Sequence, residues 1–385
     1  MSLNISSNFD SGAIEVIDIR EPSNIRLRMR DDHGSTEFRQ WFHFRISGAV
    51  GQALVLKFEN AGNCSYPEGW RDYRALASYD RREWFRLPDC DYDGSVLTVR
   101  LTPERDAIWL AYFEPYSQER HLELLGRAAM TPGVAVRRLG GSLQGRDIDM
   151  VEIGTAEPGK RSVWVVARQH PGEAMAEWFA EGLIERLLDA ADPIAGAIRS
   201  RAVVRVVTNI NPDGAFLGNL RSNAAGVNLN REWLTPTDER SPEIVCVQQA
   251  MLETGVDLFL DIHGDETLPY VFIDGSHMVP GYGVKNAELQ GDFLADLAVA
   301  SPDFQRRHGY SDDRFESELL TLGSKWVAQR FGCVSLTLEM PFKDNADAPD
   351  ARYGWSGARS KHLGVAMLQP ILRHLRRLGA DETGG

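Results

Sequence analysis

A short uninterrupted apolar segment, Val163–Ala167, places the strongest constraint on the fold of this chain. It reads Val-Trp-Val-Val-Ala, with no polar side chain in between. A strand with one solvated face alternates between apolar and polar residues, so a continuous run is typical of a strand buried on both faces of a parallel sheet. Such a sheet needs helices on each face, which predicts further strands and helices in alternation along the chain.

The segments that follow fit this alternation. Apolar residues recur at helical spacing from Glu173 to Ala190. Another helix is expected to begin at Ser241-Pro242, where a capping residue precedes a proline, and to end near Gly255. We therefore predict an α/β domain over residues 116–385, with a mixed, largely parallel sheet flanked by helices. Its other strands are expected at Val203–Val207, Asp257–Ile262 and Cys333–Glu339.

The N-terminal part of the chain has a different pattern. Short alternating runs are separated by turn-forming stretches such as Asp31-Asp32-His33-Gly34. Many short strands at this spacing predict an all-β sandwich, and we expect it to occupy residues 1–115 as a separate domain. The runs lie at Ala13–Ile19, Ile25–Met29, Trp41–Ile46, Ala53–Phe58, Val96–Leu101 and Ile108–Phe113.

Composition and charge exclude several classes of protein. The chain has 385 residues, of which 43% are hydrophobic, so it can bury a large core and is neither disordered nor fibrous. Its net charge of −13 argues against a nucleic-acid or acidic-membrane partner. No apolar run approaches the roughly 18 residues that span a bilayer, and the N-terminus lacks a signal-peptide pattern. We therefore expect a cytoplasmic protein. The four scattered cysteines do not predict a disulfide scaffold.

Two predicted strands end directly in groups that bind metal ions. The strand at Val163–Ala167 leads into His170 and Glu173, and the strand at Asp257–Ile262 leads into His263. In a parallel α/β sheet, ligand sites lie beyond the carboxyl ends of the strands, so these side chains can converge. Two imidazoles and a carboxylate would leave a fourth position open, which is the arrangement of a catalytic zinc site. The competing interpretation is that both histidines only cap loops.

The segment between these strand ends is too polar for a core and too rich in fixed polar groups for an ordinary loop. It contains Asn211-Pro212-Asp213-Gly214, then Arg221, then the run Asn228–Trp233 with Asn230 and Arg231. Arginine contacts a carboxylate through two parallel hydrogen bonds, and asparagine adds a further donor. Beside a metal these residues would suit an anionic substrate, whereas without the metal motif they would be solvated surface arginines.

A carboxylate ends the last predicted strand. Glu339 interrupts the otherwise apolar stretch around Leu338 and Met340. Burying a carboxylate is costly unless it has a partner or a function. Beside a metal-activated water it would serve as general base and then as general acid. The alternative interpretation of a lone glutamate at this place is a structural hydrogen-bond acceptor.

Taken in order, these residues give the chain a family resemblance. It resembles the zinc metallocarboxypeptidases of the carboxypeptidase A class (peptidase family M14). Within that class it is most similar to the cytosolic carboxypeptidase branch, in which an all-β domain precedes the catalytic one. The motifs that carry the resemblance are HPGE at 170–173, NPDG at 211–214, GNLR at 218–221, NLNREW at 228–233, DIHGDE at 261–266 and TLEMPF at 337–342.

The resemblance implies a hydrolase that removes the C-terminal residue of peptides or proteins with one Zn²⁺ ion per chain. His170, Glu173 and His263 would bind the ion. Glu339 would activate the attacking water and pass its proton to the leaving amine. Peptide and protein C-termini are then the expected partners, with no role for nucleic acid or membranes.

The same resemblance implies the substrate contacts. Arg221 would stabilise the oxyanion, while Asn230 and Arg231 would hold the terminal carboxylate. One departure is Asn228, where many relatives have an aspartate that orients the first zinc-binding histidine. Asparagine still accepts a hydrogen bond but supplies no charge, so somewhat weaker zinc binding is expected. Tyr310 lies at a spacing that does not fit the substrate-covering tyrosine of the classical enzymes, so it receives no role.

Substrate preference and two other functions stay open. The cytosolic branch is associated with acidic C-terminal residues, which a basic residue ahead of the catalytic glutamate is thought to select. Lys325 and Arg330 are candidates for that residue, and both would otherwise be surface residues of a helix. The same zinc site would also serve an amidohydrolase acting on N-acyl amino acids. A chain with an inactive site would be a binding protein.

Overall fold

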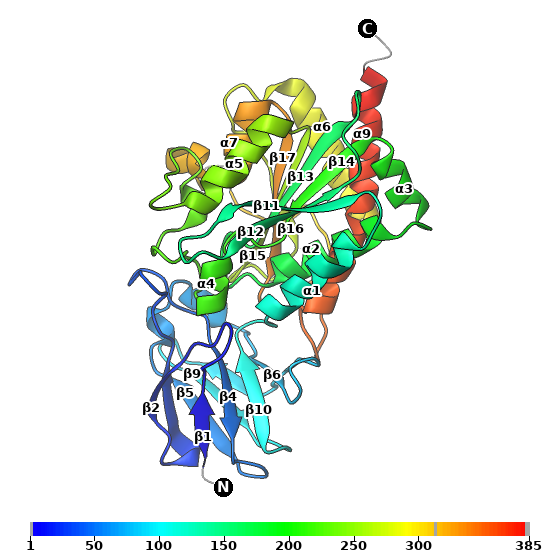
Figure 1. The fold of residues 1–385 in the computed structure, drawn as a ribbon. Coiled ribbons are helices and arrows are strands. Elements are labelled where there is room, and N and C mark those ends of the chain that lie inside the picture. Colours follow the sequence, from blue (N-terminus) through cyan, green and yellow to red (C-terminus); the bar gives the residue numbers. More distant parts are fainter. Residues whose placement is uncertain (1–2, 312–313, 382–385) are drawn as a thin grey trace.

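The computed structural model describes residues 3–311 and 314–381 and shows two parts stacked end to end (Figure 1). Within these residues, the N-terminal part is a sandwich of two five-stranded sheets, with strand orders β1-β4-β10-β6-β7 and β2-β3-β5-β9-β8. The predicted all-β sandwich is therefore confirmed. Its strands are β1 (Asn4–Ser6), β2 (Glu15–Asp18), β3 (Ile25–Arg28), β4 (His43–Ser47), β5 (Leu54–Phe58), β6 (Leu76–Ser78), β7 (Phe85–Arg86), β8 (Cys90–Tyr92), β9 (Leu97–Leu101) and β10 (Ala107–Ala111).

The C-terminal part is built on one mixed sheet. Over the described range, its seven strands follow the order β11-β12-β14-β13-β15-β17-β16. The central strands β14, β13, β15 and β17 pair in parallel, and the pairings toward either edge are antiparallel. The predicted mixed sheet with a parallel centre is confirmed. Its strands are β11 (Val134–Gly141), β12 (Asp147–Ile153), β13 (Arg161–Ala167), β14 (Ala202–Val207), β15 (Leu258–Asp265), β16 (Phe272–Asp274) and β17 (Val334–Pro341).

Helices cover both faces of this sheet. Figure 1 shows α2, α3 and α9 on one side and α5 and α7 on the other. No helix of the described residues is long and apolar enough to cross a membrane. The helices are α1 (Gln118–Ala129), α2 (Met175–Leu188), α3 (Pro193–Arg199), α4 (Pro212–Leu217), α5 (Pro242–Thr254), α6 (Gly283–Ala300), α7 (Gly323–Phe331), α8 (Gly357–Ala366) and α9 (Leu368–Asp381).

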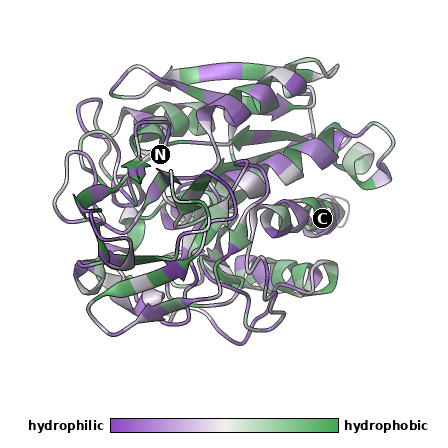
Figure 2. Ribbon diagram, turned by 90° about the horizontal axis from the view of Figure 1, so that it is seen from below, coloured by the Kyte–Doolittle hydropathy of each residue, from purple (hydrophilic) through white to green (hydrophobic). Residues whose placement is uncertain are grey.

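Strand β13 is buried on both faces, as its apolar run predicts. Val163, Val165 and Ala167 pack into one hydrophobic core together with α2. Trp164 and Val166 point the other way and pack into a second core with α5. No solvated face remains on this strand, which is the physical reason for the unbroken run. Figure 2 shows that the surrounding helices carry both hydrophilic and hydrophobic residues, as expected for helices that each have one buried side.

The predicted helices match observed ones, but several elements were not predicted. The helix expected at 173–190 is α2, and the helix expected from Ser241 is α5, which ends at Gly255 with a φ of +70°. The hairpin of β11 and β12 and the helices α3, α6, α8 and α9 were missed. Strand β11 lies at the sheet edge with no fully buried residue, so its sequence lacks a sustained alternation of apolar side chains.

A buried arginine joins the two parts of the chain. Arg86 of β7 is 4% exposed, and its guanidinium donates to the backbone oxygens of Phe342, Lys343 and Trp355 at 2.6, 2.9 and 3.1 Å. The Phe342 ring also stacks on Tyr112 of the β domain at 4.6 Å between centroids. Phe342 directly follows β17, so the β domain holds the end of the strand that carries Glu339.

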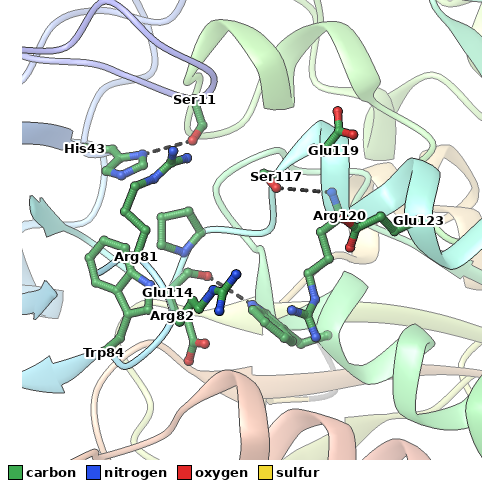
Figure 3. Close-up of a pocket in the computed structure, with 12 residues that line it drawn as sticks. Ser11, His43, Arg81, Arg82, Trp84, Glu114, Ser117, Glu119, Arg120 and Glu123 are labelled. Atoms are coloured by element: carbon green, nitrogen blue, oxygen red, sulfur yellow. Dashed lines mark hydrogen bonds between the residues drawn. The ribbon is translucent and has the colours of Figure 1, made fainter. Parts of the chain in front are cut away.

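A cavity of about 460 Å³ lies at the same junction, between the β domain and helices α1 and α2 (Figure 3). The first turn of α1 is already hydrogen-bonded there. Ser117 Oγ accepts from the amide of Arg120 at 3.2 Å, and the Asp10 carboxylate accepts from the amide of Gln118 at 2.8 Å. Polar contacts therefore stabilise the junction alongside apolar packing.

Candidate active site

The predicted metal ligands and Glu339 meet at the carboxyl ends of three neighbouring parallel strands. In the register of β15 with β17, His263 lies directly opposite Glu339. Strand β13 pairs with the other side of β15, so the turn after β13 brings His170 and Glu173 to the same edge. This is the edge at which open α/β sheets bind their ligands.

His170, Glu173 and His263 form a tight buried group. The two Nδ1 atoms lie 2.6 and 2.8 Å from the two carboxylate oxygens of Glu173, and 3.2 Å from each other. Among the described residues, these three side chains form a cluster that could hold a metal ion, with one donor atom from each within 4.8 Å of the others. Two imidazole nitrogens and one carboxylate match the donor set of catalytic zinc sites. The residues therefore fit the metal that the sequence predicts.

Hydrogen bonds on the far side of each ring orient these imidazoles. His170 Nε2 lies 3.1 Å from Asn228 Oδ1, and His263 Nε2 lies 3.0 Å from Asp261 Oδ1. With a metal ion bound and a proton on each Nε2, both Nδ1 lone pairs would point at the ion. Asn228 thus occupies the orienting place expected for it. Asp261, for which no role was predicted, orients the second ring.

Burial and nearby charges shift the pKa values of the two histidines in opposite directions. Burial lowers the pKa of His170 to about 4, and the charge of Arg221 acts in the same direction, so the ring is neutral and its lone pair is available. Burial also opposes a charge on His263, but the carboxylates of Asp261 and Glu173 outweigh it and raise the pKa of His263 well above its usual value. The same carboxylates stabilise a metal cation placed between the rings.

A buried arginine shapes the turn that carries the first ligands. Arg168 adopts a φ of +60°, a left-handed conformation that costs a side-chain-bearing residue about 1 kcal/mol or more. Its guanidinium donates to the backbone oxygens of Pro171 and Tyr116, both at 3.0 Å, and to Glu177 at 2.6 Å. These bonds compensate the strain and fix the path of the chain through His170.

Glu339 faces the cleft beside the cluster. Burial and the neighbouring carboxylates of Glu173 and Asp265 raise its pKa well above the usual value, although His263 opposes the shift. Tyr310 Oη donates to Asp265 at 2.6 Å, and the same oxygen lies 3.2 Å from Glu339 Oε1. Glu339 Oε2 is buried and has no hydrogen-bond partner among the described residues. An unpaired acceptor at this place suits a group that takes a proton from a bound water.

Arg221, Asn230 and Arg231, which were predicted to bind the substrate, line the same cleft of about 250 Å³. The Arg221 guanidinium lies 3.8 Å from Glu173. Asn230 Oδ1 accepts from the amide of Gly323 at 2.8 Å, which fixes its side chain. Arg231 is one quarter exposed, so neither arginine is freely solvated at the surface. The wall also includes Tyr66, Asp265, Glu266, Asp274, Tyr310, Arg314, Phe315 and Thr337.

Lys325 differs from the other predicted site residues because it does not line this cleft. It is 2% exposed, so it is not a surface residue of its helix. Its ammonium pairs with Asp274 at 2.9 Å and donates to the backbone oxygen of Gly275. Asp274 does line the cleft, so Lys325 can act on a substrate only through this carboxylate. Arg330, the other candidate, is exposed.

Tyr66 and Arg314 were not predicted as site residues, and Tyr310 was considered from the sequence but received no role. Tyr66 comes from the β domain, Arg314 follows no strand end, and Tyr310 carries no local motif. Each of the three lies in a loop rather than in a helix or strand. Polarity alone could have drawn attention to Arg314, but no spacing marks any of the three.

Comparison with known proteins gives the same family as the geometry. Residues 5–113 match the cytosolic carboxypeptidase N-terminal domain, and residues 124–355 match the zinc carboxypeptidases. The chain is 51% identical to a metallo-carboxypeptidase from Burkholderia cenocepacia, over 98% of this chain and 100% of that one, with a TM-score of 0.95. It is 46% identical to a metallo-carboxypeptidase from Pseudomonas aeruginosa in complex with (2-guanidinoethylmercapto)succinic acid, over 97% and 100%, with a TM-score of 0.92.

A eukaryotic relative matches over a smaller share of its own length. Mouse cytosolic carboxypeptidase 4 is 30% identical over 71% of this chain, but the match spans only 28% of the mouse protein. The resemblance predicted from the motifs is thereby confirmed for both parts of the chain. The chain belongs to the zinc carboxypeptidase family and carries the N-terminal domain of the cytosolic carboxypeptidases.

Proposed function

We propose that the protein is a zinc-dependent carboxypeptidase that hydrolyses the C-terminal peptide bond of peptides or proteins. The observation that carries this proposal is the composition of one cleft. It combines the three metal-binding side chains and Glu339 with Arg221 and Arg231. A hydrolytic centre next to a carboxylate-binding group restricts cleavage to chain ends, because an internal peptide bond has no carboxylate at that distance.

His170, Glu173 and His263 would hold the Zn²⁺ ion. When bound, Zn²⁺ lowers the pKa of water toward ~7 and polarises a carbonyl oxygen. Glu339 would accept a proton from the attacking water at Oε2 and deliver it to the nitrogen of the departing residue. Arg221 would donate hydrogen bonds to the carbonyl oxygen as negative charge grows on it, an effect worth about 3 kcal/mol in comparable sites.

Arg231 and Asn230 would hold the terminal carboxylate of the substrate. Arg231 Nε donates to the carboxylate of Glu318 at 2.8 Å, so its guanidinium is oriented to receive a carboxylate. The Glu318 side chain is 42% exposed and can turn away into solvent. The Pseudomonas aeruginosa relative binds a succinic acid derivative, which supports carboxylate recognition by this protein.

A preference for Glu or Asp at the C-terminus extends this proposal. Arg314 lines the cleft and is close to its rim, with its guanidinium 3.7 Å from the centre of the Tyr310 ring. Lys325 compensates the charge of Asp274, which is the carboxylate nearest to it on the cleft wall. The compensated wall would then accept an acidic side chain without repulsion from Asp274.

The proposed substrates are peptide or protein C-termini in the cytoplasm. The cytosolic carboxypeptidases among the relatives support that compartment. The chain corresponds to 28% of mouse cytosolic carboxypeptidase 4, so the substrates of the longer protein are not assigned to it. Its net charge of −13 gives no general attraction for acidic tails, so any selectivity must come from the cleft itself.

The zinc-loaded protein is expected to shorten peptides by one C-terminal residue, measured by mass spectrometry on peptides that differ only in the last residue. The same peptides with an amidated C-terminus should resist, because Arg231 then has no carboxylate to bind. Glu339→Gln should slow release by roughly 10²–10⁴-fold while zinc stays bound. If zinc-loaded protein shortens no peptide but releases the acid from N-acyl amino acids, the amidohydrolase function is correct instead.

Asp261→Asn is expected to weaken Zn²⁺ binding about 10–100-fold, because the carboxylate that orients His263 loses its charge. Competition with a coloured chelator measures this affinity without any substrate. Asn228→Asp is the matched variant with the opposite expected effect. It adds a negative charge beside His170 Nε2 and should strengthen Zn²⁺ binding. Unchanged affinity in Asp261→Asn would mean that other contacts orient the His263 ring.

Lys325→Met is expected to lower the ratio of terminal Glu release to terminal Leu release about tenfold, because Asp274 is left uncompensated in the cleft. Asp274→Asn should raise the same ratio. The ratio of kcat/KM values on two otherwise identical peptides is the measurement. Arg330→Met, on the exposed side of the same helix, serves as the control. A ratio that does not move in Lys325→Met would remove this residue from the selectivity.

A further inference from the structure

A carboxylate of the β domain binds the loop that carries Arg221. Asp32 lies between β3 and β4 and is 5% exposed. Its Oδ1 accepts from the amide of Leu220 at 2.6 Å, and its Oδ2 accepts from the amides of Arg221 and Ser222 at 2.8 and 2.9 Å. The Ser222 hydroxyl adds a fourth bond, also at 2.9 Å. Three consecutive backbone amides therefore converge on one buried side chain from the other domain.

The two loops also approach each other too closely for side chains. A Cβ on Gly226, which has a φ of +75°, would lie 2.0 Å from the backbone oxygen of Gly34. The side chain of Asn219 accepts from the amide of His33 at 2.8 Å and donates to the oxygen of Ser222 at 2.9 Å. The loop that carries Asp32 and the loop that carries Arg221 are therefore closely packed, and a small shift of either loop would disrupt the hydrogen bonds to Asp32.

This interface is directly connected to the catalytic groups. The backbone oxygen of Leu220 accepts from the amide of Gly172 at 2.8 Å, and Gly172 lies between the metal-binding residues His170 and Glu173. On the other side, the ring of Tyr66 from the β domain lies 5.5 Å from the guanidinium carbon of Arg221. The β domain therefore contacts Arg221 at its backbone and at its guanidinium.

We propose that Asp32 is a positioning residue for Arg221, so that the β domain forms part of the catalytic machinery. The inference rests on the proposed carboxypeptidase function, in which Arg221 stabilises the oxyanion. A donor of this kind helps only when it is held where the charge develops, and displacements of about 1 Å can cost roughly 10²-fold in rate. The bond from the Arg221 amide to Asp32 fixes the point from which that side chain extends.

A carboxylate is required at this place for a simple chemical reason. It offers two acceptor oxygens and no donor, which matches the four N–H and O–H groups that point at it. Asparagine in the same position would direct an NH₂ group at one set of these donors. Asp32→Asn is therefore nearly unchanged in shape but loosens the loop.

The test compares Asp32→Asn in the wild-type chain and in an Arg221→Ala background, using full-length zinc-loaded protein and a peptide substrate. In the wild-type chain, kcat should fall about 10–100-fold with KM changed less than about threefold. In the Arg221→Ala background, the same substitution should change kcat less than about twofold, because the group that it positions is gone. Ser222→Ala, which removes one of the four bonds, should give a smaller loss and serves if Asp32→Asn folds poorly.

Asp31→Asn is the matched control, since Asp31 is the adjacent residue, is 41% exposed and pairs with Arg39 within the β domain. It should leave kcat unchanged. Hydrogen exchange followed by mass spectrometry should show faster exchange at residues 218–224 in Asp32→Asn only. Equal losses of kcat in both backgrounds, or normal exchange of this loop, would overturn the positioning role. A wild-type chain that shortens no peptide overturns the proposed function instead, and the exchange data still report on the loop.

Discussion

The parallel pairing of β13, β15 and β17 is the constraint on which the rest of the site depends. Its register sets His263 opposite Glu339 and brings the turn with His170 and Glu173 to the same edge. A slip of one residue would turn these side chains to the opposite face of the sheet. The two hydrophobic cores that β13 separates make such a slip costly, because every residue of its apolar run is buried. The same strand register therefore determines both the packing of the core and the positions of the metal-binding side chains.

The second determinant is the concentration of buried acidic groups at this edge. Glu173, Asp261, Asp265, Glu266 and Glu339 all lie there with little exposure. Buried negative charges that lack a nearby positive charge destabilise the folded protein. This cost raises the pKa of Glu339, which favours its neutral form, and the pKa of His263, which favours its cationic form. A divalent cation bound by the two histidines and Glu173 would relieve this cost. The β domain holds the backbone on both sides of the cleft, because Arg86 donates to the backbone oxygen of Phe342 and Asp32 accepts from the amide of Arg221.

The residues that could be predicted from the sequence are those whose place follows from a local pattern. His263 lies near the carboxyl end of the apolar strand β15, and His170 lies in the turn that follows β13, so strand prediction alone brings them together. Asp32 could not be predicted, because its partners lie 188 to 190 residues away and no spacing records the contact. Lys325 shows a different limit. Helical spacing in the short helix α7 does not indicate that the edge strand β16 lies against the side that carries Lys325. Lys325 pairs with Asp274 of that strand and therefore does not line the cleft.

The most direct test of this account is a crystal structure of the zinc-loaded full-length protein with anomalous diffraction recorded on either side of the zinc absorption edge. We expect one strong anomalous peak per chain, bonded to His170 Nδ1, the Glu173 carboxylate and His263 Nδ1, with an open position toward Glu339. A peak bonded to other residues, or an empty cluster in crystals grown with excess zinc, would contradict the assignment of the catalytic centre.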